Sequence, residues 1–141
     1  MERSGSAVWK GSLKEGKGTV STESGALAKA EYAFKTRFEE SKGTNPEELI
    51  AAAHAGCFSM ALSAQLGNAG ITPDSIATTA TVILEKLDAG FTITAVHLDV
   101  LAKIPGADKK AFETAANNAK SGCPVSKVLN AKITMDAKLE S

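Results

Sequence analysis

The sequence predicts an α+β fold in which mostly antiparallel sheets wrap around a long buried helix. Residues 49–66 form an apolar segment of helical composition, and β-like segments with alternating side chains lie before and after it. No linker, repeat or low-complexity stretch interrupts the 141 residues. A chain of this length fits one domain, so we expect a single domain over residues 1–141.

Three strands are expected before the helix. Residues 8–13 alternate loosely, a turn at Gly16-Lys17-Gly18 follows, and residues 19–22 return as the second strand of a hairpin. Beyond a turn at Gly25, aromatic residues alternate with basic ones, which predicts a third strand with Arg37 near its end. The residues of this alternation are Tyr32, Phe34, Lys35, Arg37 and Phe38.

The central helix has clear start and stop signals. An N-cap residue precedes Pro46, and two carboxylates follow in the first turn, a combination that favours a helix N-terminus. Residues 49–66 are apolar nearly all the way round the helix, so the rest of the protein must enclose them. Gly67 and Gly70 end the helix. One small domain does not cover such a helix, so we expect a second subunit to do so.

The remaining chain predicts a second hairpin, two helical segments and a last strand. Residues 78–84 and 91–101 are rich in β-branched residues and flank a turn at Asp88-Ala89-Gly90. A helix is expected over residues 109–120, and a short helical turn follows Cys123-Pro124. The last strand is expected around Ile133, Met135 and Leu139.

The charge balance argues against polyanionic partners. Lys and Arg together number 16, and so do Asp and Glu, so no net field attracts nucleic acid or an anionic membrane. The N-terminal residues 1–11 lack the order of a secretory signal, and no run of about 18 apolar residues is evident for a membrane span. We therefore expect a cytoplasmic protein without nucleic-acid or membrane partners.

The two cysteines are either inert core thiols or the site of chemistry, because thiols in a reducing compartment rarely form structural disulfides. Cys57 lies mid-helix among apolar residues, where burial would raise its pKa, so a reactive thiolate there needs a nearby cation or hydrogen-bond donors. Cys123 precedes Pro124 at the start of a helical turn, where free backbone N–H groups favour a thiolate. Their spacing of 66 positions does not by itself pair them.

His54 allows three interpretations, two functional and one structural. It lies three residues before Cys57 on nearly the same helix face, so it could tune that thiol. It could also bind zinc together with Cys57, Cys123 and His97, although the paired ligand spacing of zinc modules is missing. A histidine simply hydrogen-bonded in the interior is the third reading.

Arg37 and Glu47 are the candidate activators of a cysteine. Arg37 is one of only two arginines, and a guanidinium can donate to a thiolate and a carboxylate at once. The alternative for Arg37 is a solvated ion pair with Glu39 or Glu40. Glu47 lies about 15 Å from Cys57 along the helix axis, so it would act by orienting an arginine or by entering the site of another subunit.

Three segments together resemble the OsmC/Ohr family of hydroperoxide reductases. They are Gly43-Thr44-Asn45-Pro46-Glu47-Glu48-Leu49, Ala51-Ala52-Ala53-His54-Ala55-Gly56-Cys57-Phe58 and Cys123-Pro124-Val125-Ser126. Two further runs, residues 16–22 and Thr36-Arg37-Phe38-Glu39, are most similar to the OsmC branch, as is His54. The resemblance extends from about Trp9 to the last strand, in register with both cysteines.

The resemblance implies an intertwined homodimer with two sites at the subunit interface. The family's peroxidatic cysteine matches Cys57, its resolving cysteine matches Cys123, its glutamate matches Glu47, and its arginine matches Arg37. It further implies a thiol peroxidase of oxidative or osmotic stress defence, acting on organic hydroperoxides and hydrogen peroxide. In that cycle Cys57 becomes a sulfenic acid, Cys123 closes a disulfide on it, and a lipoyl-type or thioredoxin-type dithiol reopens it.

No metal, flavin or haem is needed for this chemistry, and an apolar pocket around Phe58, Met60 and Leu62 would suit organic peroxides. The rival from another class is a stress-related thiol sensor or ligand-binding dimer with the same fold, and a zinc protein is a further alternative.

Overall fold

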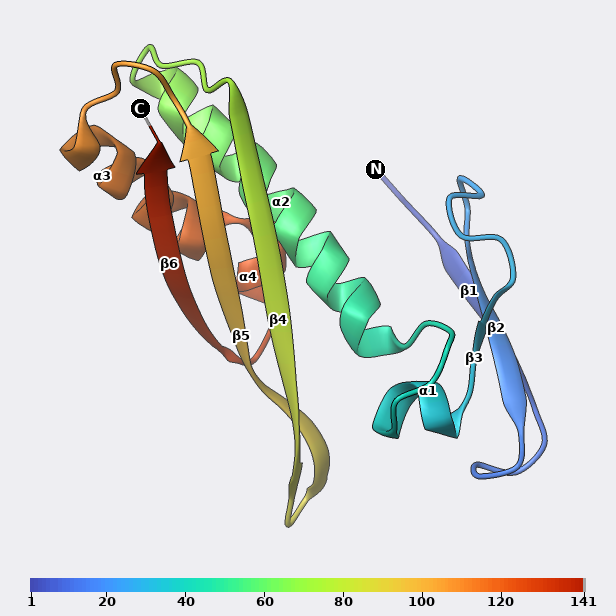
Figure 1. The fold of residues 1–141 in the computed structure, drawn as a ribbon. Helices are drawn as coiled ribbons and strands as arrows, with labels where there is room; N and C mark the ends of the chain where they lie inside the picture. The colour runs from blue at the N-terminus through green and yellow to red at the C-terminus, as the bar shows by residue number, and fades with distance from the viewer. Residues whose placement is uncertain (141) are drawn as a thin grey trace. The chain divides into compact units, whose positions relative to one another are not determined.

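The computed structural model describes residues 1–140. Two compact units make up the chain, a first unit of residues 1–49 and a second unit that starts at residue 50. Figure 1 shows an antiparallel sheet and a short helix in the first unit, and a sheet with helices in the second. The predicted α+β class is confirmed, and the site residues divide between the two units.

The sheet of the first unit has the order β1-β2-β3, formed by β1 (Gly5–Lys10), β2 (Lys17–Thr22) and β3 (Ala30–Tyr32). Its first two strands confirm the predicted hairpin, although β1 begins earlier than expected. Gly18 pairs with Trp9, and a Cβ at this position would lie 2.7 Å from the Tyr32 ring. Only glycine fits there, so the aromatic side chains can pack over the strand.

The predicted third strand is wrong beyond Tyr32, because α1 (Phe34–Phe38) is a short helix. The Ala33 backbone N–H donates to Thr36 Oγ1 at 2.8 Å, which caps the turn. The rings of Phe34 and Phe38 lie 4.9 Å apart, one helical turn from each other. A spacing of four residues fits a helix face as well as a strand face, and the Thr36 cap decides for the helix.

The predicted central helix is confirmed as α2 (Pro46–Asn68), but one chain does not enclose it. Only one stripe of the helix is fully buried, His54, Phe58, Leu62 and Leu66, whereas Met60 is 78% exposed. Within one chain only 22% of an apolar stretch of 18 residues in α2 is buried. By length and composition α2 is long enough and apolar enough to cross a membrane. The expectation that the chain has no apolar segment of this length is therefore wrong. The core helices of soluble proteins can be equally long and apolar.

The second unit contains a three-stranded sheet of order β4-β5-β6. The strands β4 (Ser75–Leu87) and β5 (Gly90–Lys103) form the predicted hairpin, and β6 (Lys132–Glu140) lies parallel to β5. A parallel neighbour requires a crossover, which α3 (Lys109–Gly122) and α4 (Pro124–Val128) provide. Figure 1 shows α2, α3 and α4 on one side of this sheet.

The core of the second unit lies between that sheet and the helices. Alternate residues of β5 meet apolar residues of α2 and α3, and Cys123 belongs to the same cluster. At the junction of α3 and α4, the crossover connection brings the chain next to α2. Cys123 is therefore buried against the helix that carries Cys57. The members of the cluster from these elements are Phe58, Leu62, Leu66, Val96, Leu98, Val100, Ala102, Phe112, Ala115, Ala116 and Ala119.

Candidate active site

The two cysteines lie together in the second unit. Both are free, and the Sγ atoms of Cys57 and Cys123 are 2.9 Å apart, although 66 positions separate them in the chain. Cys123 is fully buried, whereas Cys57 is partly exposed. A disulfide bond needs about 2.05 Å between the sulfur atoms, so a small movement would join them. Cys57 is therefore the thiol that a reagent from solution meets first.

The surroundings of the two thiols move their pKa values in opposite directions. Burial raises the pKa of Cys57, and its hydrogen bond with Cys123 raises it further. Burial also acts to raise the pKa of Cys123, but its hydrogen bonds with Cys57, Ser126 and Val125 outweigh burial, and the pKa is lowered. Cys123 is therefore the thiol of the pair that loses its proton more readily, and Cys57 still lacks an activator.

His54 joins the thiol pair through a serine. Its Nε2 atom lies 2.7 Å from the Oγ atom of Ser126, whose hydroxyl and backbone N–H both hydrogen-bond with Cys123. From the sequence, Ser126 is predicted only as part of the segment Cys123-Pro124-Val125-Ser126. The signal was its spacing: Ser126 follows Cys123, the N-cap of α4, by three positions, and residues three apart lie on the same helix face.

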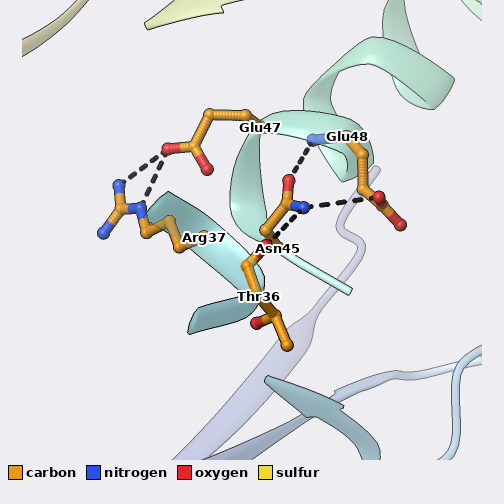
Figure 2. A network of polar contacts seen from close by, with 5 residues as sticks. All are labelled: Thr36, Arg37, Asn45, Glu47 and Glu48. Carbon is orange, nitrogen blue, oxygen red and sulfur yellow. Dashed lines mark hydrogen bonds and ion pairs between the residues drawn. The ribbon is translucent and has the colours of Figure 1, made fainter. Parts of the chain in front are cut away.

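The first unit holds the other pair of predicted residues. Arg37 donates from Nε to Glu47 Oε1 at 3.0 Å, and its Nη2 lies 2.8 Å from the same oxygen (Figure 2). The expectation that Glu47 orients an arginine thus has a direct contact behind it, and the alternative pairing with Glu39 or Glu40 does not form. The other carboxylate oxygen, Glu47 Oε2, is buried and has no partner within residues 1–140.

Asn45 fixes α1 against the start of α2. Its Oδ1 accepts from the Glu48 backbone N–H at 2.8 Å, and its Nδ2 donates to the Thr36 carbonyl at 3.0 Å and to Glu48 Oε1 at 3.3 Å (Figure 2). Asn45 is thus both the cap of α2 and a bridge to α1. Because Arg37 follows Thr36 and Glu47 follows Pro46, this bridge holds the ion pair in register.

An Asn45→Ala variant is expected to lose about 1–2 kcal/mol of unfolding free energy, since a helix cap and a bridge are removed together. An Asn45→Asp variant keeps the capping oxygen and loses only the amide donor, so it serves as the matched control with the smaller loss. Urea denaturation followed by circular dichroism measures both. Equal losses in the two variants would show that the cap at Glu48 contributes nothing.

An aromatic hollow of about 260 Å³ lies beside Arg37 in the first unit. Trp9, Tyr32, Phe34 and Phe38 line it, and the Arg37 guanidinium lies 5.3 Å from the centre of the Phe38 ring. The predicted apolar pocket around Phe58, Met60 and Leu62 is wrong, because Phe58 and Leu62 are completely buried in the core. An apolar surface next to a charged donor thus exists, but on another part of the chain.

The four residues of the zinc alternative do not form one cluster. Within residues 1–140, the one group of at least three metal-ligating side chains with close ligand atoms is His97, Asp99 and Asp136, on the face of the sheet away from the thiols. His97 Nε2 lies 3.2 Å from Asp136 and 3.4 Å from Asp99, and these contacts occupy it. The structure therefore brings the predicted site residues together as two pairs, one in each unit.

Comparisons with known proteins cover most or all of this chain. A family model described as OsmC-like protein matches residues 39–138. Peroxiredoxin OsmC of Escherichia coli (strain K12) is 58% identical over 141 residues, covering 100% of this chain and 99% of that protein. An organic hydroperoxide resistance protein of Xanthomonas axonopodis pv. citri is 30% identical over 98 residues, covering 69% of this chain and 67% of that protein.

Solved structures of low sequence identity share the fold. The organic hydroperoxide resistance protein OhrB of Bacillus subtilis has a TM-score of 0.70 at 23% identity, covering 96% of this chain and 98% of that chain. An OsmC-like protein of unknown function from Vibrio cholerae has a TM-score of 0.77 at 18% identity, covering 98% of this chain and 99% of that chain.

Proposed function

This chain belongs to the OsmC family, and from that premise we propose that it is a thiol-dependent peroxidase that reduces organic hydroperoxides, and also hydrogen peroxide, in oxidative or osmotic stress. The observation that carries the proposal is the distance of 2.9 Å between the free sulfur atoms of Cys57 and Cys123. Two thiols this close are a two-electron reductant, which is what the cleavage of one peroxide bond requires. The substrate is a hydroperoxide, and a thiol reductant restores the enzyme.

Cys57 carries out the first step because it is the accessible thiol of the pair. Its thiolate attacks the distal oxygen of the peroxide, the sulfur–oxygen bond forms, and the oxygen–oxygen bond breaks. The alkoxide leaves and takes up a proton, which gives an alcohol, or water when the substrate is hydrogen peroxide. Cys57 is left as a sulfenic acid.

Cys123 carries out the second step. Its thiolate attacks the sulfenic sulfur of Cys57, the disulfide bond forms, and hydroxide leaves and is protonated to water. The hydrogen bonds that lower the pKa of Cys123 keep this thiolate available. A lipoyl-type or thioredoxin-type dithiol then reduces the disulfide. The proposed cycle uses no cofactor. Free thiols persist under the reducing conditions of the cytoplasm, which is the location we propose.

Cys57 needs a cation for the first step, since burial raises its pKa. We assign this role to Arg37. Two nitrogen atoms of its guanidinium, Nε and Nη2, contact Glu47 Oε1, and this contact orients the side chain. A guanidinium has further donors that can meet a thiolate and the leaving oxygen. The aromatic hollow beside Arg37 would then receive the organic part of the peroxide.

We propose that the protein is a homodimer, which would explain the exposed apolar surface of the central helix. In this assembly the two units of each chain act together as one functional domain. Met60 on α2 is 78% exposed, and the apolar stretch of 18 residues in α2 is only 22% buried in one chain. Surfaces of this kind normally mark an interface. In such a dimer the Arg37–Glu47 pair of one subunit would complete the thiol site of the other. Neither a membrane nor nucleic acid is proposed as a partner.

Light scattering after gel filtration tests the dimer. The expected mass is twice 14.5 kDa, or 29 kDa. A Met60→Glu variant is expected to weaken the association, because a charge would be buried against an apolar face. The exposed Lys109→Glu change on α3 is the matched control. A parent protein that elutes at the monomer mass would contradict the assembly.

A peroxide assay tests the function itself. Cumene hydroperoxide and the reduced protein are mixed with excess dihydrolipoamide, and the remaining peroxide is measured over time. Many turnovers per subunit are expected. Consumption limited to a single turnover would instead support the alternative function, a stress-related thiol sensor or ligand-binding dimer, which the free thiol pair would also allow.

A further inference from the structure

A continuous series of contacts links a buried histidine to the two thiols of the second unit. His54 Nε2 lies 2.7 Å from Ser126 Oγ, the Ser126 hydroxyl hydrogen-bonds with Cys123, and the Cys123 and Cys57 sulfur atoms are 2.9 Å apart. His54 is completely buried. The protonation of the buried imidazole determines which partner donates in the hydrogen bond with Ser126, and this in turn determines which way the Ser126 hydroxyl points.

The directions of these hydrogen bonds follow from the burial of His54. Burial lowers the pKa of His54, so the ring is neutral and only one nitrogen carries a hydrogen. His54 Nδ1 is buried and has no partner within residues 1–140. We therefore assign the hydrogen to Nε2, because a buried N–H without a partner costs more than a buried ring nitrogen that lacks a donor. Nε2 then donates to Ser126 Oγ, and the serine hydroxyl is left to donate to sulfur.

We propose that His54 is a positioning residue of the resolving step: it holds the Ser126 hydroxyl in the orientation that donates to the Cys123 thiolate. The role rests on the proposed peroxidase cycle, in which that thiolate attacks the Cys57 sulfenic acid, the disulfide forms and hydroxide leaves. His54 does not touch the reacting atoms, and it neither gains nor loses a proton. Its effect reaches Cys123 only through Ser126.

The groups that act on Cys123 make this hydroxyl important. Cys57 and His54 face it from α2, the latter through Ser126, and the N–H groups of Val125 and Ser126 face it from α4. The core cluster around it contributes apolar residues of α3 and β5. Among residues 1–140, no Lys, Arg, Asp or Glu shifts the pKa of this thiol. Oriented neutral donors must therefore hold its charge.

The test titrates Cys123 alone. In a Cys57→Ser background the ultraviolet absorbance of the thiolate is followed against pH, so that only one cysteine contributes. Ser126→Ala and His54→Phe are each expected to raise the pKa of Cys123 by about one unit, as the loss of a hydrogen bond to a charged acceptor does. Because His54 acts through Ser126, the double variant is expected to show no further rise.

Two amide variants separate positioning from packing. Glutamine places its Nε2 near the position of the histidine Nε2, whereas the asparagine amide is too short to reach Ser126. His54→Gln is therefore expected to restore the parent pKa of Cys123, and His54→Asn is expected to behave like His54→Phe. The asparagine variant also carries the comparison if the phenylalanine variant does not fold. Equal pKa values in the Gln and Asn variants would overturn the proposal.

A kinetic measurement follows in the chain with both cysteines. After one equivalent of peroxide, Cys57 sulfenic acid is expected to form at the parent rate in His54→Asn, whereas the disulfide is expected to form about threefold more slowly below the pKa. Tenfold less thiolate is partly offset by its greater nucleophilicity. Parent-like disulfide formation would overturn the role. Because the titration needs no peroxide, an inactive protein with the expected pKa shifts would contradict the peroxidase function alone.

Discussion

Cys57→Ser is expected to abolish catalytic peroxide consumption, with a loss of at least about a thousandfold, because the hydroxyl of serine has no adjacent base and does not ionise near neutral pH. Peroxide is measured over time with dihydrolipoamide in excess. Ser121→Ala, an exposed change close to Cys123 in the chain, is the matched control and is expected to keep the parent rate. Parent-like consumption by Cys57→Ser would remove Cys57 from the cycle.

Cys123→Ser is expected to give a different failure. The first peroxide is still reduced at about the parent rate, but the sulfenic acid at Cys57 then has no thiol 2.9 Å away to condense with. Excess peroxide carries it on to the sulfinic acid, an irreversible product in the absence of a dedicated repair enzyme. Mass spectrometry of the intact variant is expected to show two added oxygen atoms on Cys57. A stable single oxygen, or sustained turnover, would show that Cys123 has no resolving role.

Much of the fold follows from local patterns that carry one meaning. The start of α2 is predicted by Asn45, Pro46 and the glutamates of the first turn. The prediction is reliable because Asn45 does cap the helix, accepting a hydrogen bond from the Glu48 backbone N–H. The sequence wrongly predicts a strand after Tyr32, because a spacing of four residues between Phe34 and Phe38 fits both the helical and the strand period. The Thr36 side-chain cap decides between them, and a hydrophobic pattern does not include it.

The sequence names the residues of the candidate site but not the contacts between them. The sequence placed free N–H groups next to Cys123, and the hydrogen bonds from Val125 and Ser126 agree with that interpretation. The contact between Cys57 and Cys123 depends on the parallel return of β6 beside β5, a long-range pairing that no local pattern encodes. The hydrogen bond between His54 and Ser126 spans 72 positions and depends on the same crossover.

Helix periodicity also explains why the predicted enclosure of α2 differs from its burial in one chain. A helix that is apolar all the way round was expected to be enclosed, yet a single chain buries only the stripe that includes His54, Phe58 and Leu62. Periodicity reports where apolar residues lie, but not whether the same chain or a partner covers them. The exposed remainder of α2 is the surface that the proposed homodimer would cover.

Arg37→Ala is expected to lower the rate of peroxide reduction by about a hundredfold near neutral pH, because a cation within contact distance lowers a thiol pKa by about one to three units. Without the guanidinium, burial and the hydrogen bond with Cys123 leave the pKa of Cys57 raised, so less thiolate exists at each pH. The rate against pH is therefore expected to shift towards alkaline pH and to recover there. A shift towards acid pH, or no shift, would contradict the role of Arg37 as an activator.

Glu47→Gln separates the orienting role from the charge. Glutamine keeps an oxygen that can accept from Arg37 but loses the ionic attraction, so a smaller loss of about tenfold is expected. Glu48→Gln is the matched control, since Glu48 hydrogen-bonds with Thr44 and Asn45 and not with Arg37. If Glu47 acts only by holding Arg37, Arg37→Ala combined with Glu47→Gln is no slower than Arg37→Ala alone. An additive loss would mean that the carboxylate, whose Oε2 has no partner among residues 1–140, acts on the reaction by a route of its own.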